Sequence, residues 1–174
     1  IDEWIRSNTK NKYDDNGEIA KTGKVNELIS NQAFENFYNR PNQNLLSFDT
    51  KDFSLGFVRG LSLEDGAATL TDFTARIIES GLFSFLSKAK DNLCRVLVCG
   101  GGRKNTNLIE RIKTRIPKNF IIQLIDDYGI DGDYVESQAF AYLAIRSFLN
   151  LPISFPDTTG CKEPTTGGIL VKNF

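Results

Sequence analysis

Hydrophobic residues recur at the spacing of an α-helix in several stretches of the chain. The longest stretch covers about residues 63–80, and Ser62 stands where an N-cap would satisfy the first turn. Its apolar face would carry Leu63, Ala67, Leu70, Phe73, Ile77 and Ile78. Shorter stretches predict further helices, within residues 1–12, 25–38 and 105–115 and from Asp133 to about 149. The polar residues 13–24 predict a loop.

Two short apolar runs predict β-strands, from Cys94 to Cys99 and from Phe120 to Ile125. The helix between them makes a strand-helix-strand unit, so the strands should be parallel with a right-handed crossover. The first run is apolar enough for a strand that is covered on both faces. A long loop is expected over residues 150–168, with a weak last strand at 168–171. These elements predict a helix-rich α/β fold with a small, mainly parallel sheet, in a single domain spanning residues 1–174.

Three consecutive glycines, Gly100, Gly101 and Gly102, follow the first predicted strand and precede a helix that Asn105 could cap. Without side chains, the backbone N–H groups of such a turn can approach an anionic or flat ligand closely, as in nucleotide sites. A tight turn between a strand and a helix can also require glycine with no ligand present. The motif alone leaves both interpretations open, and capping is the simpler role for Asn105.

Composition limits the function classes. The chain has 174 residues, a net charge of −1 and 40% hydrophobic residues, as in ordinary globular proteins. We therefore expect no nucleic-acid partner and no membrane span. It has no histidine, which excludes histidine bases and ligands, and its three cysteines lack the spacing of a zinc site, so no metal site is expected. A cytoplasmic location fits this pattern, with Cys94 and Cys99 buried in the first strand.

Several charged residues have both structural and functional interpretations. The turn at Asp14–Gly17 lacks the other ligands of a calcium loop, so it is predicted to be solvated. Arg103 and Lys104 could steer a phosphate, but surface charges are the simpler interpretation. Asp133 and Glu136 have the spacing of a capping box at the start of the last helix.

A set of motifs, in order along nearly the whole chain, resembles a known family. The motifs are GKVNE (23–27), GLSLEDGAATLTDFTARII (60–78), VCGGGRKNTNLIERI (98–112), GID (129–131), ESQAFAYLA (136–144) and LPISFPDTTGCKEPTTGG (151–168). Together they are similar to the C-terminal half of anhydro-N-acetylmuramic acid kinase. That family belongs to the sugar kinase/heat-shock protein 70/actin superfamily. The resemblance implies the C-terminal lobe of an actin-like ATPase, with the ribonuclease H-like fold.

The resemblance also implies a reaction and site residues. The family uses ATP and Mg²⁺ to open the 1,6-anhydro ring of its amino sugar with water and to phosphorylate the 6-oxygen. Gly100, Gly101 and Gly102 match the family's glycine run at the adenosine, with Asn105 close by. Glu136 matches a glutamate near the bound sugar. The family's N-terminal phosphate loop and its Asp-x-Gly-Pro-Gly-Asn segment, which carries the general base, are not in this sequence and are expected upstream of Ile1.

Two functional hypotheses follow. In the first, the chain is the C-terminal portion of this kinase, and it is active only with the missing N-terminal half. In the second, it is a truncated binding or structural module without catalysis, as a fragment, a processed chain or a trimmed one would be. Another sugar kinase of the superfamily shares the glycine turn but not the flanking motifs. The predicted partners are the anhydro-amino-sugar and either the N-terminal half or further copies of the chain.

Overall fold

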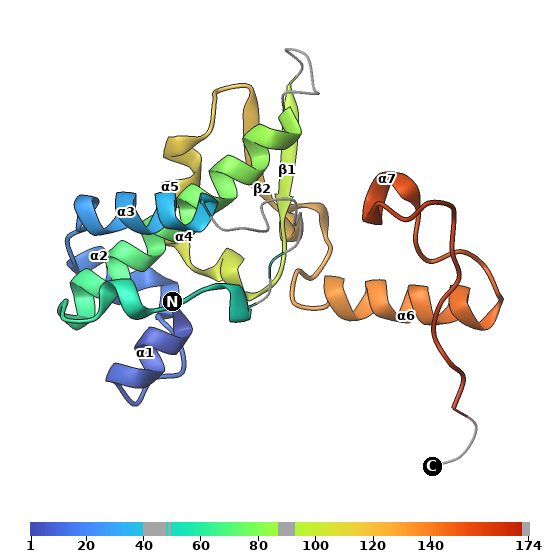
Figure 1. Ribbon diagram of the computed structural model, residues 1–174, viewed down its shortest axis with the longest axis horizontal. Coiled ribbons are helices and arrows are strands. Elements are labelled where there is room, and N and C mark those ends of the chain that lie inside the picture. The colour runs from blue at the N-terminus through green and yellow to red at the C-terminus, as the bar shows by residue number, and fades with distance from the viewer. Residues whose placement is uncertain (40–47, 49, 87–92, 172–174) are drawn as a thin grey trace. The chain divides into compact units, whose positions relative to one another are not determined.

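The computed structural model describes residues 1–39, 48, 50–86 and 93–171 (Figure 1). The helices are α1 (Asp2–Asn8), α2 (Glu18–Thr22), α3 (Glu27–Tyr38), α4 (Leu63–Leu86), α5 (Thr106–Arg115), α6 (Val135–Phe148) and α7 (Pro156–Thr159). The strands are β1 (Cys94–Val98) and β2 (Phe120–Leu124). The predicted long helix, the βαβ unit and the helix-rich α/β class are confirmed. The predicted loop at 13–24 is wrong, because it contains a 3-10 turn at Asp15–Gly17 followed by α2.

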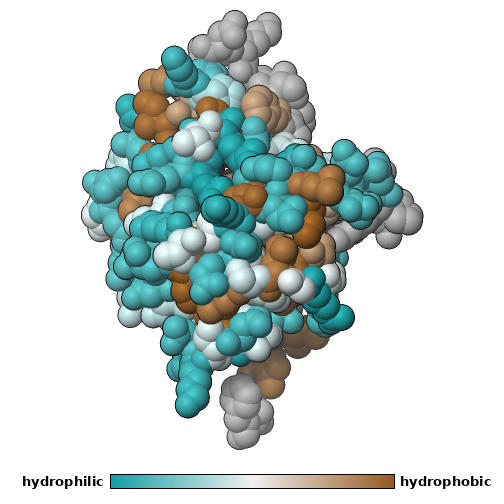
Figure 2. All heavy atoms as spheres, turned by 90° about the vertical axis from the view of Figure 1, so that its left-hand side faces the viewer, coloured by the Kyte–Doolittle hydropathy of each residue, from teal (hydrophilic) through white to brown (hydrophobic). Residues whose placement is uncertain are grey.

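The chain divides into two compact units, Ile1–Leu124 and Ile125–Phe174. In the first unit, α4 is the central element and packs against α1, α2, α3 and α5. Because helices pack on several sides of α4, it has apolar residues around much of its circumference. The outer face of this unit that carries α1–α3 is mostly hydrophilic, with hydrophobic patches between the polar side chains (Figure 2).

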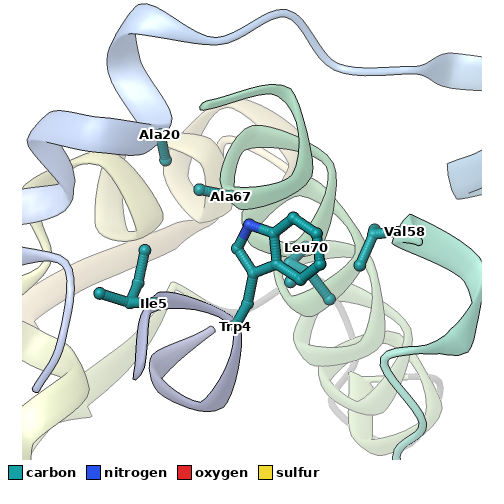
Figure 3. Close-up of a cluster of buried hydrophobic side chains, with 6 residues drawn as sticks. All are labelled: Trp4, Ile5, Ala20, Val58, Ala67 and Leu70. Carbon is teal, nitrogen blue, oxygen red and sulfur yellow. The ribbon is translucent and has the colours of Figure 1, made fainter. Parts of the chain in front are cut away.

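One hydrophobic cluster joins α1, α2 and α4. The Trp4 indole projects from α1 toward α4, with Leu70 behind its ring and Val58 beyond it (Figure 3). Its Nε1–H donates a hydrogen bond of 3.0 Å to the carbonyl oxygen of Leu63, so the buried indole has its polar group satisfied. The cluster fixes the N-terminal segment on the first turns of α4.

Gly66 allows this close contact. A Cβ at Gly66 would lie 2.5 Å from two carbon atoms of the Trp4 ring. We expect Gly66→Ala to lower the free energy of unfolding by about 1–3 kcal/mol, the usual cost of overpacking. Urea denaturation followed by the fluorescence of Trp4, the only tryptophan in the sequence, measures this change. An unchanged midpoint would show that the indole moves away without cost.

The two-stranded sheet is parallel, with Cys94 opposite Phe120 and Val98 opposite Leu124, which confirms the predicted orientation. One face packs on α4 and α5 through Ala75, Leu108, Ile109, Ile112 and Ile122. On the other face Leu97 and Ile121 are 45% and 38% exposed. The prediction of a strand covered on both faces is therefore wrong, and so is that of two buried cysteines, since Cys94 is half-buried and Cys99 exposed.

A buried carboxylate ties three helices of the first unit together. Asp72 of α4 is only 2% exposed and accepts a 2.8 Å hydrogen bond from the Ser30 hydroxyl of α3. The Arg115 guanidinium of α5 pairs with the same carboxylate, and Arg111 Nη1 lies 3.6 Å from it. Arg115 also approaches Glu79 at 3.6 Å. The carboxylate is thus surrounded by donors from two neighbouring helices.

The second unit consists of a 3-10 turn at Ile125–Tyr128, α6, α7 and an isolated antiparallel bridge between Ser154 and Thr165. Helix α6 starts at Val135, with Tyr134 at the N-cap position and no side-chain cap. The predicted capping box of Asp133 and Glu136 is therefore wrong. The expected strand at 168–171 is also wrong, since a strand requires a paired neighbour and these residues have none among those described.

Cys161 in the second unit has a thiol whose pKa is lowered from its ordinary value. The Thr159 hydroxyl, and then that of Ser154, hydrogen-bond to it and lower the pKa of its thiol by stabilising the thiolate. As pH rises, Cys161 should therefore become alkylated at a lower pH than an ordinary thiol. Iodoacetamide labelling at stepped pH, with peptide mass spectrometry, measures this order. Cys99, which is exposed, serves as the internal control, and labelling of both thiols at the same pH would contradict the expectation.

Candidate functional site

The first unit contains a cavity of about 920 Å³, which we call the groove. This volume lies at the upper end of the range of small-molecule sites, about 300–1,000 Å³. Its walls come from α1, the turn at Tyr13–Asn16, residues 50–57, one side of α4, and the segment from the glycine turn to the start of α5. Of the residues that the sequence singled out, Gly101, Gly102 and Asn105 line it together.

The glycine turn has two kinds of glycine. Gly100 has a φ of +77°, a backbone conformation that side chains rarely tolerate, so the turn itself explains its identity. Gly101 and Gly102 begin the 3-10 turn Gly101–Lys104 and have no such φ. A Cβ built on either would meet no atom of the protein within 4 Å. Neither backbone strain nor internal packing therefore requires glycine at these two positions, which line the groove.

Asn105 caps α5, as the sequence predicted. Its Oδ1 accepts a 2.9 Å hydrogen bond from the N–H of Leu108. Only the amide oxygen of Asn105 can accept this hydrogen bond. The oxygen therefore faces the N–H of Leu108, and the amide nitrogen is not used by the cap. Among the described residues this nitrogen has no hydrogen-bond partner. A residue of the groove wall therefore holds an unused donor.

Two cations follow the glycines, and they differ in environment. Arg103 is 7% exposed and donates a 3.0 Å hydrogen bond from Nη1 to the carbonyl oxygen of Gly100, so the prediction of a surface charge is wrong for this residue. Because a peptide group is planar, fixing that carbonyl also fixes the N–H of Gly101 on the opposite side. Lys104 is exposed and lines the groove. The turn thus combines fixed backbone amides with a cation at the groove.

The opposite lip of the groove is a turn that the sequence did not assign to the site. Asp14 is 4% exposed and Gly17 is buried, so the prediction of a solvated turn is wrong for these two residues, while Asp15 and Asn16 are exposed. Asp15 and Asn16 line the groove. Asn16 and Gly17 have φ values of 52° and 73°, the left-handed conformation that an Asn-Gly pair favours. That pair, and an aspartate placed to cap α2, were the signals available in the sequence.

Glu136 lies in the second unit, exposed in the first turn of α6, where the helix dipole favours a carboxylate. In the same unit Asp126 accepts a 3.4 Å hydrogen bond from the N–H of Gly132. The described residues contain no group of three or more histidine, cysteine or acidic side chains that could hold a metal ion. Within the described part of the chain, no helix has both the length and the apolar character to cross a bilayer.

Comparison with known proteins identifies the family. The sequence model of the family described as anhydro-N-acetylmuramic acid kinase matches residues 1–173. The chain belongs to this family. Curated relatives with that name share 54% identity in Pelagibacter ubique, over all of this chain, and 39% in Zymomonas mobilis, over 97% of it. A third, from Caulobacter vibrioides, is 37% identical over 98% of the chain.

The chain spans less than half the length of these kinases. The match covers 46% of the Pelagibacter ubique relative and 44% of each of the other two. The resemblance drawn from the separate motifs is confirmed at the level of the family. The region that contains the groove and α6 therefore corresponds to less than half of each of these relatives.

Proposed function

We propose that this chain is the nucleotide-holding C-terminal portion of a kinase that acts on 1,6-anhydro-N-acetylmuramic acid. In this proposal it forms one lobe of a two-lobe, actin-like kinase of the cytoplasm. One observation carries the nucleotide role. The space beside Gly101 and Gly102 is open, and no contact inside the protein requires glycine at either position. Bare backbone amides beside Lys104, in a groove of suitable volume, are suited to a nucleotide.

The proposed reaction uses ATP and water. Water adds to the anomeric carbon and opens the 1,6-anhydro bridge, and the γ-phosphoryl group of ATP passes to the 6-oxygen, giving N-acetylmuramic acid 6-phosphate and ADP. Mg²⁺ bound to the phosphates would neutralise their developing charge. In this proposal the general base lies in the part of the kinase that this chain does not span, and we assign no metal ligand to this chain.

The residues of this chain then have separate tasks. The glycine turn would hold the nucleoside end of ATP, and Asn105 would donate a hydrogen bond to it. Glu136 would accept hydrogen bonds from the sugar hydroxyls, since carboxylate oxygens are acceptors and Glu136 lies in the first turn of α6. The part of the kinase that this chain does not span would supply the base and the other wall of the sugar site.

Complementation tests this assignment. The part of the Pelagibacter ubique relative that this chain does not match is fused to this chain, which gives what we call the completed kinase. We expect the completed kinase to phosphorylate the anhydro-sugar with ATP and Mg²⁺, and the chain alone to give no turnover. Glu136→Gln should raise the KM for the sugar and leave the KM for ATP unchanged. A completed kinase that binds neither ligand would favour the alternative, a structural module without catalysis.

Asn105→Asp separates capping from nucleotide binding. Aspartate caps a helix as well as asparagine does, so the thermal midpoint should stay within about 2 °C of the unsubstituted protein. The substitution replaces the amide donor with a carboxylate oxygen, so the Kd for ATP should rise by about tenfold or more, a loss of about 1.4 kcal/mol. Thermal unfolding and calorimetric titration of the completed kinase measure both. An unchanged Kd would show that Asn105 only caps α5 and does not contact the nucleotide.

A further inference from the structure

The turn from Asp14 to Gly17 is attached firmly to α2. The buried Asp14 carboxylate accepts hydrogen bonds from the N–H groups of Ile19 and Ala20, at 2.8 and 3.0 Å. Ala20 has no exposed surface and belongs to the cluster around Trp4. One side of the turn is therefore anchored, through α2, in the hydrophobic core of the first unit.

The other side of the turn contacts the beginning of α5. The Thr106 hydroxyl donates a 3.0 Å hydrogen bond to the carbonyl oxygen of Asn16. A Cβ at Gly17 would lie 2.3 Å from Oδ1 of Asn105 and 2.7 Å from Cβ of Asn107. With its φ of +73°, position 17 accepts only a residue without a side chain. Gly17 thus lies directly against the oxygen with which Asn105 caps α5.

We propose that the Asp14–Gly17 turn positions Asn105 for the nucleotide. Contact with Gly17 holds the side chain on the groove wall, where its oxygen accepts the hydrogen bond from the N–H of Leu108 and its nitrogen stays a donor without a partner among the described residues. The ligand atom it would meet is a hydrogen-bond acceptor of the nucleoside, such as a ring nitrogen or a ribose oxygen. This inference rests on the proposed nucleotide site and adds a positioning element that does not itself touch the ligand.

A double-mutant cycle in the completed kinase tests the coupling. Gly17→Ala should displace the Asn105 side chain and raise the Kd for ATP about tenfold. Asn105→Ser keeps a capping hydroxyl but removes both the oxygen beside Gly17 and the amide donor. In that background Gly17→Ala should change the Kd less than twofold, because the clash with Asn107 is the same in both backgrounds and no amide donor remains to be displaced. Equal effects in both backgrounds would overturn the inference, since a general structural change does not depend on Asn105.

A second variant guards against misfolding of Gly17→Ala. Thr106→Val removes the hydroxyl that holds the turn, at an exposed position outside the groove lining. We expect a Kd for ATP that is about threefold higher in the normal background and unchanged with Asn105→Ser. Lys113→Gln, exposed on the same helix, is the matched control and should leave the Kd for ATP unchanged.

The two proposals fail in different ways. If ATP does not bind even without substitutions, the proposed function fails. If ATP binds but the effect of Gly17→Ala does not depend on Asn105, only this inference fails.

Discussion

Replacing Gly101 or Gly102 by alanine is expected to weaken ATP binding severely while leaving the fold intact. A Cβ at either position meets no protein atom within 4 Å, and both residues line the groove. The free energy of unfolding should therefore rise slightly, by about 0.4–1 kcal/mol, because alanine restricts the unfolded chain. The Kd for ATP should increase about tenfold or more, since the added methyl group occupies the space that the nucleoside needs.

Gly81→Ala is the matched control for this prediction. Gly81 lies inside α4, also has open space around it, and does not line the groove. Its replacement should raise stability by about 0.5–1 kcal/mol and leave the Kd unchanged. Calorimetric titration and urea denaturation of the three variants in the completed kinase give both quantities. If Gly101→Ala and Gly102→Ala bind ATP as well as Gly81→Ala does, the glycine turn connects β1 to α5 without binding the nucleotide.

Asp72→Ala is expected to cause the largest loss of stability in the chain. The substitution leaves Arg111 and Arg115 without the carboxylate between them, and it removes the acceptor of the Ser30 hydroxyl. Removing one partner of a buried ion pair costs about 3–5 kcal/mol, because the other charges stay partly buried and uncompensated. Helix α5 would lose its polar link through Asp72 to α3 and α4 and keep only the approach of Arg115 to Glu79, which weakens the support of the glycine turn.

An exposed ion pair provides the comparison. Glu18 and Lys21 pair at 2.9 Å, with side chains that are 68% and 40% exposed. Glu18→Ala should lower the free energy of unfolding by less than about 1 kcal/mol. Urea denaturation followed by Trp4 fluorescence compares the two variants under the same conditions. A loss for Asp72→Ala no larger than that for Glu18→Ala would show that the network does not hold the helices together.

The sequence predicts what depends on local spacing. The 3.6-residue period of Leu63 to Ile78 located α4, and the two apolar runs gave a parallel βαβ unit. The N-cap at Asn105 followed from residue type and position alone. These features require only the physics of a single element or of two elements close in sequence.

Features that depend on distant contacts were missed. Arg103 looked like a surface charge, because its hydrogen-bond acceptor, the carbonyl oxygen of Gly100, comes within reach only once the glycine turn has formed. The whole Asp14–Gly17 turn looked solvated, because the contact of Gly17 with the start of α5, about ninety residues further along, cannot be read from the sequence. The capping box at Asp133 failed because α6 begins one residue later, after Tyr134. A residue's spacing predicts its local partners and not its tertiary ones.

The central claim is that the glycine turn and the start of α5 form a nucleotide site. Proton–nitrogen correlation spectra of the completed kinase, titrated with ATP and Mg²⁺, test it most directly, because glycine amides resolve well. The account predicts that the amides of Gly101, Gly102 and the side chain of Asn105 shift on titration, while those of Gly60 and Gly81 do not. Shifts elsewhere with none at Gly101 and Gly102 would contradict it.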